Sequence, residues 1–460
     1  MENSKEVAAD KGQSFIDVIH VKNLIAGRTY KFKGTLKNKV NGETIKDAAG
    51  KEVVAERTFT TDDIQAVEIT ASPNAFNFTT ADGTLLDMAA DHANYLYSGD
   101  VELEFKGFDF SNLNNVKGVV FEEVTLIKDG KETKVGEHKD ITDVDQFIIF
   151  SEVHTSAKDV DTDSKVVPRD TVTTLKDEVE YKNLIPGKKY TLVATLHVKN
   201  DISGKYKDGD SLKTDGEEVT VEHEFIPQTP DGTETVEISL DTGNLPKMQI
   251  VVFEKLKNSF GIEVGMHCDI NDDKQTLNVP DGHTTATDDE TKDHVSNAAK
   301  KVTITDIVYY ENLEPDKEYE VTGTLYVKEK EEPLRINGKT VTVTKKFTPK
   351  KSDGTVEIKF TIDASELKGQ TFVAFEKVKR NGITVFVHEN IDDEEQTIHV
   401  PDGHTTAIDK DTQDHVSQSK KTVTIVDKVY YENLVFFINR KQYIHSTITW
   451  RPITKHTPTD

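Results

Sequence analysis

The sequence is poor in cysteine, in basic residues and in long apolar runs. Cys268 is the only cysteine among 460 residues, so disulfides within the chain are excluded. Lys and Arg number 57 against 82 Asp and Glu, and the net charge of −25 argues against nucleic-acid binding, which needs a basic face. No apolar run reaches the length of a membrane span, and no charged-then-apolar signal segment opens the chain. A secreted repeat protein without disulfides would need another covalent means of stabilisation.

What the sequence does contain is internal repetition. Four aspartates each lie six residues before an Asn-Leu pair, and three glutamates each end a Val-Val-Phe-Glu or Val-Ala-Phe-Glu segment. Three histidines each lie eight residues before a glutamine, and a threonine follows each glutamine by nine residues. The repeated residues are Asp17, Asp177, Asp306 and Asp427; Glu122, Glu254 and Glu376; His138, His267 and His388; Gln146, Gln275 and Gln396; and Thr155, Thr284 and Thr405. Such a period indicates an array of similar modules.

The repeats predict domains at 1–150, 151–279 and 280–400, and the start of a fourth at 401–434, called repeats one to four below. In the later repeats the threonine lies 22 residues before the aspartate, so the count back from Asp17 ends upstream of Met1. We therefore expect repeat one to lack its first strand. The pattern stops at Leu434, and residues 435–460, which include the only tryptophan, are interpreted as an aberrant tail from a frameshift. A specialised terminal segment is the alternative.

Within a repeat the hydrophobic pattern has a period of two. In the segment TVEIKFTI (355–362) every second residue is apolar, as in a half-buried strand, and PDG, NG and SDG turns separate such runs. Long amphipathic helices are absent from the pattern. We predict an all-β chain of tandem immunoglobulin-like antiparallel β-sandwiches in an extended array. The segments ITVFVHE and QTIHVP are expected to form a hairpin that places His388 across from Gln396.

The repeated residues suggest acyl transfer inside each repeat. The Thr284 hydroxyl would attack the Gln396 carboxamide, release ammonia and leave an ester between the first and last strands. A threonine hydroxyl needs a base, and His388 is the candidate, which could then protonate the departing ammonia. Asp306 and Glu376 interrupt apolar runs and are expected to point inward. The two carboxyl groups suit either of two roles, orienting the imidazole or sharing a proton, and the sequence leaves both open.

On these motifs the chain resembles the Thr–Gln ester-bond domains (VaFE repeats) of surface-anchored adhesins from Gram-positive bacteria. The resemblance covers residues 1–434 and implies one ester in repeat two and one in repeat three. The implied ester residues are Thr155 with Gln275 and Thr284 with Gln396; the implied assisting residues are Asp177, Glu254 and His267 in repeat two and Asp306, Glu376 and His388 in repeat three. Two sites are incomplete: Asp17, Glu122, His138 and Gln146 in repeat one, and Thr405 and Asp427 in repeat four.

The resemblance predicts a fragment of a structural stalk from a bacterial cell-surface adhesin, which crosslinks itself once and is not a turnover enzyme. It implies no cofactor and no metal, and an extracellular, cell-wall-associated location for the parent protein, although no sorting motif is visible here. The main alternative is a β-sandwich array that binds a ligand without internal esters. A Thr/His/Asp hydrolase is a third hypothesis. The rod is expected to be monomeric, and an ester between Thr405 and Gln146 of two chains is the less favoured prediction.

Three weaker motifs are interpreted as inert. DVDTDS (159–164) resembles the start of a calcium loop but has Ser164 where the glycine belongs and Asp170 in place of the glutamate, which favours an acidic turn. Cys268 follows the predicted base, but the other repeats have lysine or glutamate there, which argues against a catalytic thiol. His283 and His404 lie in PDGH linkers and are expected to be surface residues.

Overall fold

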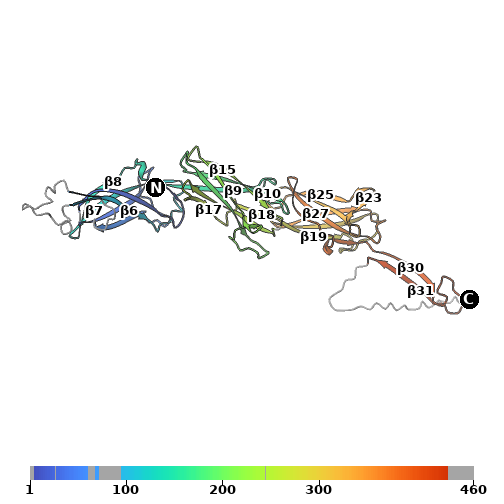
Figure 1. Ribbon diagram of the computed structural model, residues 1–460. Coiled ribbons are helices and arrows are strands. Elements are labelled where there is room, and N and C mark those ends of the chain that lie inside the picture. Colours follow the sequence, from blue (N-terminus) through green and yellow to red (C-terminus); the bar gives the residue numbers. More distant parts are fainter. Residues whose placement is uncertain (1–4, 26, 61–67, 72–94, 244, 434–460) are drawn as a thin grey trace, which may run out of the picture.

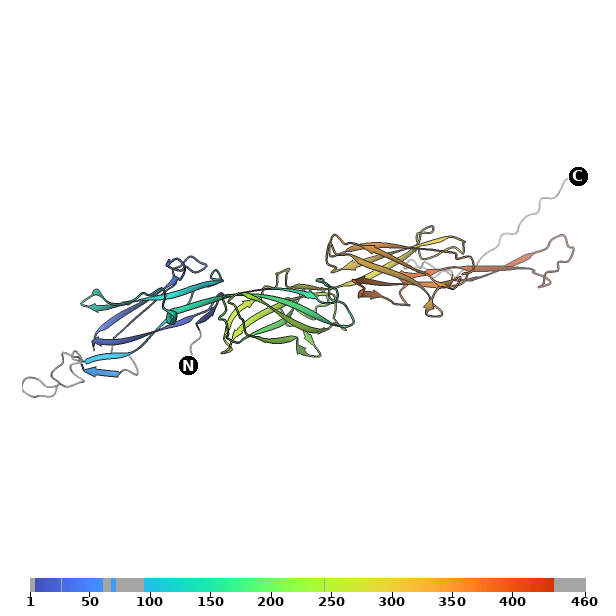
Figure 2. The ribbon, with the colours of Figure 1, turned by 90° about the horizontal axis from the view of Figure 1, so that it is seen from above.

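The computed structural model describes residues 5–25, 27–60, 68–71, 95–243 and 245–433, which follow one another as an extended row of β-modules (Figures 1 and 2). Within these residues the secondary structure consists of strands and two short 3₁₀ helices, so the all-β prediction is confirmed. No helix in the described part is long and apolar enough to cross a membrane. The predicted aberrant tail lies outside the described residues.

Repeat three is a sandwich of two antiparallel sheets. The first sheet contains, in order, β19 (Asp281–Asp288), β20 (Val302–Glu311) and β26 (Gly354–Ile362). The second contains β22 (Glu332–Pro333), β21 (Tyr319–Val327), β27 (Thr371–Arg380) and β28 (Ile383–His388), with β25 (Thr342–Phe347) on β21 and β29 (Thr397–His399) on β27. A small hairpin, β23 (Arg335–Ile336) and β24 (Lys339–Thr340), lies outside these sheets. The alternate apolar residues of β26 are buried between the sheets, as their period of two predicts.

Repeat two has the same two layers. Its first sheet contains β9 (Phe147–Asp159), β10 (Val172–Lys182) and β15 (Gly232–Asp241). Its second contains β14 (Thr220–Phe225), β11 (Tyr190–Lys199), β16 (Met248–Asn258) and β17 (Glu263–His267), with β18 (Thr276–Val279) on β16. A two-stranded ribbon, β12 (Lys213–Thr214) and β13 (Glu217–Glu218), completes the repeat. Each of the first three repeats has a buried apolar cluster, and Val166 of repeat two packs into the cluster of repeat three.

Repeat one differs at its first sheet, which contains β2 (Phe15–Ile25), β6 (Tyr95–Phe105) and β5 (Glu68–Ala71). Its second sheet contains β4 (Val54–Thr60), β3 (Thr29–Asn38), β7 (Val116–Lys128) and β8 (Lys131–His138). The short β1 (Glu6–Ala8) pairs in parallel with β9. In repeats two and three a threonine-bearing strand pairs with the strand that corresponds to β2. Among the described residues, β2 pairs only with β6 and leaves that edge open.

Repeat four is described as a two-stranded sheet of β30 (Asp402–Asp409) and β31 (Ile425–Glu432). Thr405 lies opposite Val429, and Asp427 lies opposite Ala407. This register reproduces the start of repeat three, where Thr284 lies opposite Val308 and Asp306 opposite Ala286. The first two strands of repeat four therefore pair in the same register as those of repeat three.

The last strands of repeat three do not form the predicted hairpin. β28 and β29 both pair with β27, one after the other along the same edge, and His388 lies opposite Glu376. The prediction that His388 faces Gln396 across a hairpin is therefore wrong. The physical reason is the connecting turn, which the Asp393 side chain caps and which leads into the 3₁₀ helix η4 (Glu394–Gln396). This turn moves the chain forward along β27 instead of folding it back.

The junction between repeats one and two is an unbroken strand. The first residues of β9 pair with β7 of repeat one, and residues from Glu152 onward pair with β10 of repeat two. At the later junctions Pro280 separates β18 from β19, and Pro401 lies between β29 and β30. Proline cannot donate a backbone hydrogen bond to a ladder, so it ends one strand before the next begins.

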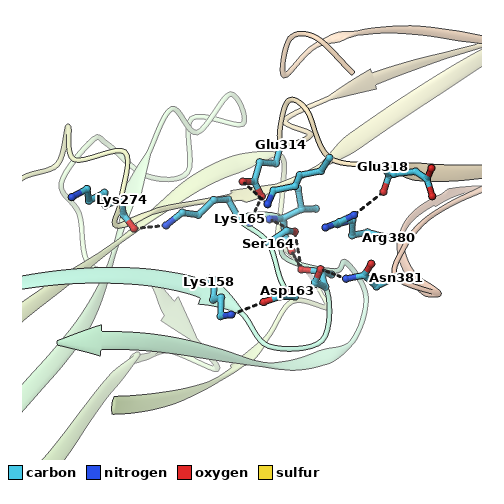
Figure 3. Close-up of polar contacts among 12 residues, drawn as sticks. Lys158, Asp163, Ser164, Lys165, Lys274, Glu314, Glu318, Arg380 and Asn381 are labelled. Carbon is cyan, nitrogen blue, oxygen red and sulfur yellow. Dashed lines mark hydrogen bonds and ion pairs between the residues drawn. The ribbon is translucent and has the colours of Figure 1, made fainter. Parts of the chain in front are cut away.

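Side chains also connect repeat two to repeat three (Figure 3). The Lys165 backbone N–H donates to Glu314 Oε2 at 2.6 Å, and Asn381 Nδ2 donates to the Thr162 carbonyl at 2.8 Å. The asparagine of the Asn-Leu motif takes part as well: Asn312 Nδ2 donates to the carbonyl oxygens of Met248 and Val279, at 3.2 and 3.1 Å. This recurring asparagine therefore binds its own repeat to the preceding one.

The first junction repeats this arrangement. Asn183 Nδ2 donates to the carbonyl oxygens of Val116 and Phe150, at 3.2 and 3.3 Å. Both asparagines have a left-handed backbone, with φ of 66° at Asn183 and 59° at Asn312. Asparagine tolerates this conformation better than most residues and also supplies the amide donor, which explains why this residue type recurs.

Candidate functional site

The threonine and the aspartate of each complete repeat meet on the inner face of the first sheet. On β19 and β20, Thr284 and Asp306 are diagonal neighbours, because each lies opposite a residue two positions from the other. Thr155 and Asp177 have the same relation on β9 and β10. All four side chains are at most 3% exposed. The first sheet thus presents a hydroxyl and a carboxyl group side by side to the interior.

The glutamate and the histidine meet on the second sheet. Glu376 lies opposite His388 on β27 and β28, and Glu254 lies opposite His267 on β16 and β17. Both glutamates belong to central strands and are fully buried, as the apolar runs around them predicted. Gln396 ends η4 and Gln275 immediately precedes β18, and both glutamines are fully buried.

In repeat three these groups are in direct contact. Thr284 Oγ1 lies 3.0 Å from Glu376 Oε2 and 3.4 Å from His388 Nδ1. The Gln396 Nε2 amide group hydrogen-bonds both Thr284 Oγ1 and Glu376 Oε2. The amide carbon of Gln396 is bonded to Nε2, and Nε2 contacts Thr284 Oγ1. A nucleophile, a base and an acyl group are therefore assembled in one water-excluded cluster.

Repeat two assembles the same groups. Gln275 Nε2 hydrogen-bonds Thr155 Oγ1. The backbone N–H of Thr155 donates to His267 Nδ1 at 3.1 Å, so the same ring nitrogen faces the threonine as in repeat three. The five residue types that sequence analysis selected are brought together in both complete repeats. Their individual chemical roles stay predictions.

Burial shifts the pKa of both carboxyl groups of each site upward, toward the protonated form. Burial raises the pKa of Glu254 to about 9, with the nearby Asp177 charge as a second cause, and burial raises the pKa of Asp177 to about 7. In repeat three burial raises the pKa of Asp306 to about 6 and holds that of Glu376 well above its usual range. Two adjacent buried carboxyl groups cannot both ionise cheaply, so each pair retains a proton at neutral pH.

The hydrogen bonding of these carboxyl groups agrees with a retained proton. If both were ionised, the two buried oxygens of Glu254 would lack a hydrogen-bond donor in the described part of the protein, because the side chain that faces them is Asp177. The amide oxygens of Gln275 and Gln396 also lack a donor there. A neutral carboxyl group supplies an O–H donor to such a cluster. Of the two roles left open by the sequence, proton sharing fits Asp177 with Glu254, and Asp306 with Glu376.

The imidazole instead meets an aspartate that sequence analysis missed. His267 Nε2 lies 2.8 Å from Asp272 Oδ2, and His388 Nε2 lies 3.2 Å from Asp393 Oδ2. The signal was available, because an aspartate stands three residues before each repeated glutamine. It was hidden among the other acidic residues of these turns. Burial lowers the pKa of both histidines, which favours the neutral form that a base needs.

Repeat one holds the partial site that the sequence predicted. Gln146 Nε2 donates to Glu122 Oε1 at 2.6 Å, and His138 Nδ1 lies 3.6 Å from Glu122 Oε2. Burial raises the pKa of Glu122 to about 8 and raises that of Asp17 as well. In repeat four, Thr405 is exposed on β30. The open edge of β2 is compatible with an added threonine strand, and a link from Thr405 to Gln146 of another chain stays a prediction.

The weaker motifs have structural surroundings that explain them. The Asp159 side chain accepts the Thr162 backbone N–H at 2.8 Å, as a capped acidic turn does, and the described residues include no cluster suited to a metal ion. His283 and His404 stack on Tyr309 and Tyr430. Each histidine thus packs on the tyrosine that lies opposite it on the neighbouring strand.

A thiol or a hydrolase mechanism gains no support from the geometry. Burial raises the pKa of Cys268 to about 11, which disfavours the reactive thiolate. A surface pocket of about 450 Å³ lies against His154 and His267, but Thr155 and Gln275 do not line it. A substrate in that pocket would therefore not reach the threonine hydroxyl.

By sequence, the chain matches the family described as "T-Q ester bond containing domain" over residues 1–150, 151–279, 281–400 and 402–446. No curated protein matches it. Among solved structures, a Mobiluncus mulieris adhesin containing intramolecular disulfide, isopeptide and ester bond cross-links is 13% identical; the alignment covers 62% of this chain and 98% of the adhesin, with a TM-score of 0.26. A Bacteroides uniformis β-glucuronidase is 10% identical over 56% of this chain and 26% of its own, with a TM-score of 0.19.

Proposed function

Because the chain belongs to the family of T-Q ester bond containing domains, we propose that repeats two and three each crosslink themselves once through a threonine–glutamine ester. The single observation that carries the proposal is the buried contact of Thr284 with Gln396, Glu376 and His388. The equivalent contact of Thr155 with Gln275 supports a second bond. The proposal concerns repeats two and three, in which this sequence contains both bonding residues.

The reaction uses only groups of the chain itself. Neutral His388 accepts the hydroxyl proton as Thr284 Oγ1 attacks the side-chain amide carbon of Gln396. In the starting geometry the amide nitrogen faces Glu376 Oε2. A turn of the amide group brings its oxygen to the proton shared by Asp306 and Glu376, which stabilises the negative charge that develops there. The imidazolium then protonates the amide nitrogen, the carbon–nitrogen bond breaks, and ammonia leaves. The new ester joins Thr284 Oγ1 to the former amide carbon, and His388 returns to its neutral form.

The positions of the bonded residues suggest a mechanical role. The threonine lies on the first strand of each complete repeat, and the glutamine directly precedes the last strand. Tension along the row enters and leaves each repeat near these two strands. A covalent bond between them would carry the load past the rest of the fold. We infer a stalk segment of a bacterial surface adhesin, extracellular and associated with the cell wall in its parent protein. A ligand-binding array without esters is the alternative.

Intact mass tests the proposal directly. The purified chain should be lighter than its sequence mass by two ammonia molecules. The Thr284→Ala chain should lack only one ammonia, because Thr155 and Gln275 still react. The ester closes a loop of about 100 residues, so its loss should lower the unfolding free energy of repeat three by roughly 4–5 kcal/mol in the chain-entropy model.

The matched control is Thr285→Ala, which changes the neighbouring threonine on the opposite face of β19. This variant should still lose two ammonia molecules. A full sequence mass for the unaltered chain would refute the ester and leave the ligand-binding array as the better explanation.

A further inference from the structure

A basic residue recurs at a position that the ester motif does not include. In all four repeats it lies 12 residues before the repeated aspartate, and the residues are Lys5, Lys165, His294 and His415. Sequence analysis missed this position because two residue types share it. The contacts of these side chains indicate what the position does.

Repeat two has the most complete set of these contacts. Lys165 Nζ donates to the backbone carbonyl oxygens of Ala157 and Lys274, and Figure 3 shows the second of these bonds. Ala157 lies two residues after Thr155 on β9, and Lys274 immediately precedes Gln275. The Lys274 carbonyl oxygen also accepts the Ala157 backbone N–H, at 3.0 Å. One half-buried ammonium group therefore joins the two segments that carry the ester residues.

Repeats one and four each show one half of this arrangement. Lys5 Nζ donates to the Val144 carbonyl oxygen at 2.6 Å, in the turn before the glutamine of repeat one. His415 Nδ1 donates to the Ala407 carbonyl oxygen at 2.8 Å, and Ala407 occupies the position of Ala157 on its strand. The basic residue thus contacts the turn before the glutamine, the strand of the threonine, or both.

Repeat three has a weaker contact at this position. His294 Nε2 lies 3.9 Å from Glu395 Oε2, and the Glu395 side chain, just before Gln396, is 71% exposed. An ion pair of this length with a solvated carboxylate contributes little. Repeat three is therefore a suitable internal comparison for repeat two.

We propose that Lys165 is a positioning residue for the Gln275 ester, which holds β9 against the turn before Gln275 and places a positive charge near the buried carboxyl pair. This inference rests on the proposed function and adds a residue to the five that recur in each complete site. The reaction needs the Thr155 hydroxyl and the Gln275 amide in contact, and a misplacement of about 1 Å can slow such a reaction about 100-fold. An ammonium group suits this task, because charged donors form stronger hydrogen bonds than neutral ones.

The charge of Lys165 also acts on the carboxyl pair. Burial lowers the pKa of Lys165, and four carboxyl groups oppose this shift: Glu314 of repeat three, Asp177 on β10, and Asp272 and Asp273 in the turn before Gln275. Burial raises the pKa of Asp177, and the Lys165 charge is among the causes that oppose the rise. Without this charge, Asp177 and Glu254 should keep their shared proton to a higher pH.

Lys165→Met in the full chain tests the inference, because methionine keeps much of the apolar stem and removes the ammonium group. The chain is recovered unreacted from inclusion bodies in denaturant, refolded by dilution, and sampled by peptide mass mapping, which follows the two esters separately. The Gln275 ester should form about 10- to 100-fold more slowly than in the parent. The Gln396 ester in the same molecules should form at the parent rate and serves as the internal clock.

Lys158→Met is the matched control. Lys158 is exposed on β9, three residues after Thr155, and pairs with Asp163 (Figure 3). Both esters of this variant should form at the parent rate. The pH profile separates positioning from a general loss of structure. In the Lys165→Met chain, the slowed Gln275 ester should keep its rate to a higher pH than in the parent, because the carboxyl pair retains its proton longer.

Fold integrity is checked in the Thr155→Ala background, where no ester can form in repeat two. There Lys165→Met should leave the thermal midpoint of repeat two within a few degrees of that background. Equal Gln275 ester rates for Lys165→Met and Lys158→Met would overturn the positioning role. A slow ester with an unchanged alkaline limit, or with a collapsed midpoint, would also overturn it, in favour of a purely structural contact. A parent chain that loses no ammonia would instead defeat the proposed function.

Discussion

At the scale of single residues, the aspartates at the equivalent position of the four repeats differ in burial. Asp177 and Asp306 are fully buried, whereas Asp17 and Asp427 are half-buried. The difference follows from the layers that cover each residue, since the complete repeats enclose the aspartate between two sheets and repeat four is described as two strands. Burial decides whether a carboxyl group keeps its proton at neutral pH.

The raised pKa values predict how pH changes the stability of repeat two without its ester. In a Thr155→Ala chain, the folded state keeps protons on Asp177 and Glu254 that the unfolded state releases near their ordinary pKa values. Between about pH 5 and 9 the folded state binds more protons, so the unfolding free energy should fall as pH rises. This loss should continue until the pH passes the Glu254 pKa of about 9.

The measurement compares Thr155→Ala with Thr155→Ala/Glu254→Gln at the same pH values. Amide hydrogen exchange in β10 and β16 reports the opening free energy of repeat two. Glutamine cannot ionise, so the double variant should lose less stability than the single variant toward pH 9. Parallel pH profiles for the two chains would show that Glu254 does not retain its proton in the folded state.

At the scale of elements, the junctions depend on the asparagine of the Asn-Leu motif. Asn312 has a left-handed backbone at the end of β20 and donates two hydrogen bonds to strands of the preceding repeat. Together with the Lys165–Glu314 and Asn381–Thr162 contacts, it ties repeat three to repeat two. The motif therefore connects neighbouring repeats. Sequence analysis did not assign it this role, because the asparagine lies outside the ester site.

Asn312→Gly should loosen this junction without unfolding repeat three. Glycine accepts the positive φ but removes both amide hydrogen bonds, each worth about 0.5–1.5 kcal/mol. A distance distribution between spin labels on repeats two and three should broaden. Asn337→Gly is the matched control, because Asn337 also has positive φ but lies in the turn between β23 and β24. Equal distributions for the two variants would contradict the junction role.

At the scale of the whole molecule, the row of repeats determines how the chain extends under force. The ester in repeat three would join residues 112 positions apart, and that in repeat two residues 120 apart. Each ester would shield almost an entire repeat from extension. β9 adds continuity at the first junction, since one strand belongs to the sheets of both repeats.

Single-molecule pulling should reveal this shielding. Thr284→Ala should add an unfolding event that releases about 37–40 nm of chain, at 3.3–3.6 Å for each freed residue. The unaltered chain should lack this event, and so should the Thr285→Ala control. An event of that length in the unaltered chain, in addition to the unfolding of repeat one, would show that repeat three carries no covalent bond.

The sequence by itself determined the repeat, the all-β class and the family, and it selected the five residue types that gather in each complete site. These follow from local rules: a period of two specifies strands and their inner faces, and recurrence at fixed spacing separates the threonine and glutamine from ordinary surface residues. The family membership and the all-β class are confirmed. The esters, the adhesin stalk and the cell-wall location stay predictions.

Only the tertiary structure decided which groups face one another. Spacing suggested that His388 lies across from Gln396, but the turn capped by Asp393 carries the chain along β27 and sets His388 opposite Glu376. Spacing also left two roles open for the carboxyl groups. In the structure Asp306 and Glu376 are buried beside each other, and the imidazole of His388 pairs with Asp393 instead. A strand's face is a local property of its sequence, whereas its neighbours depend on how turns and sheets fill the space around it.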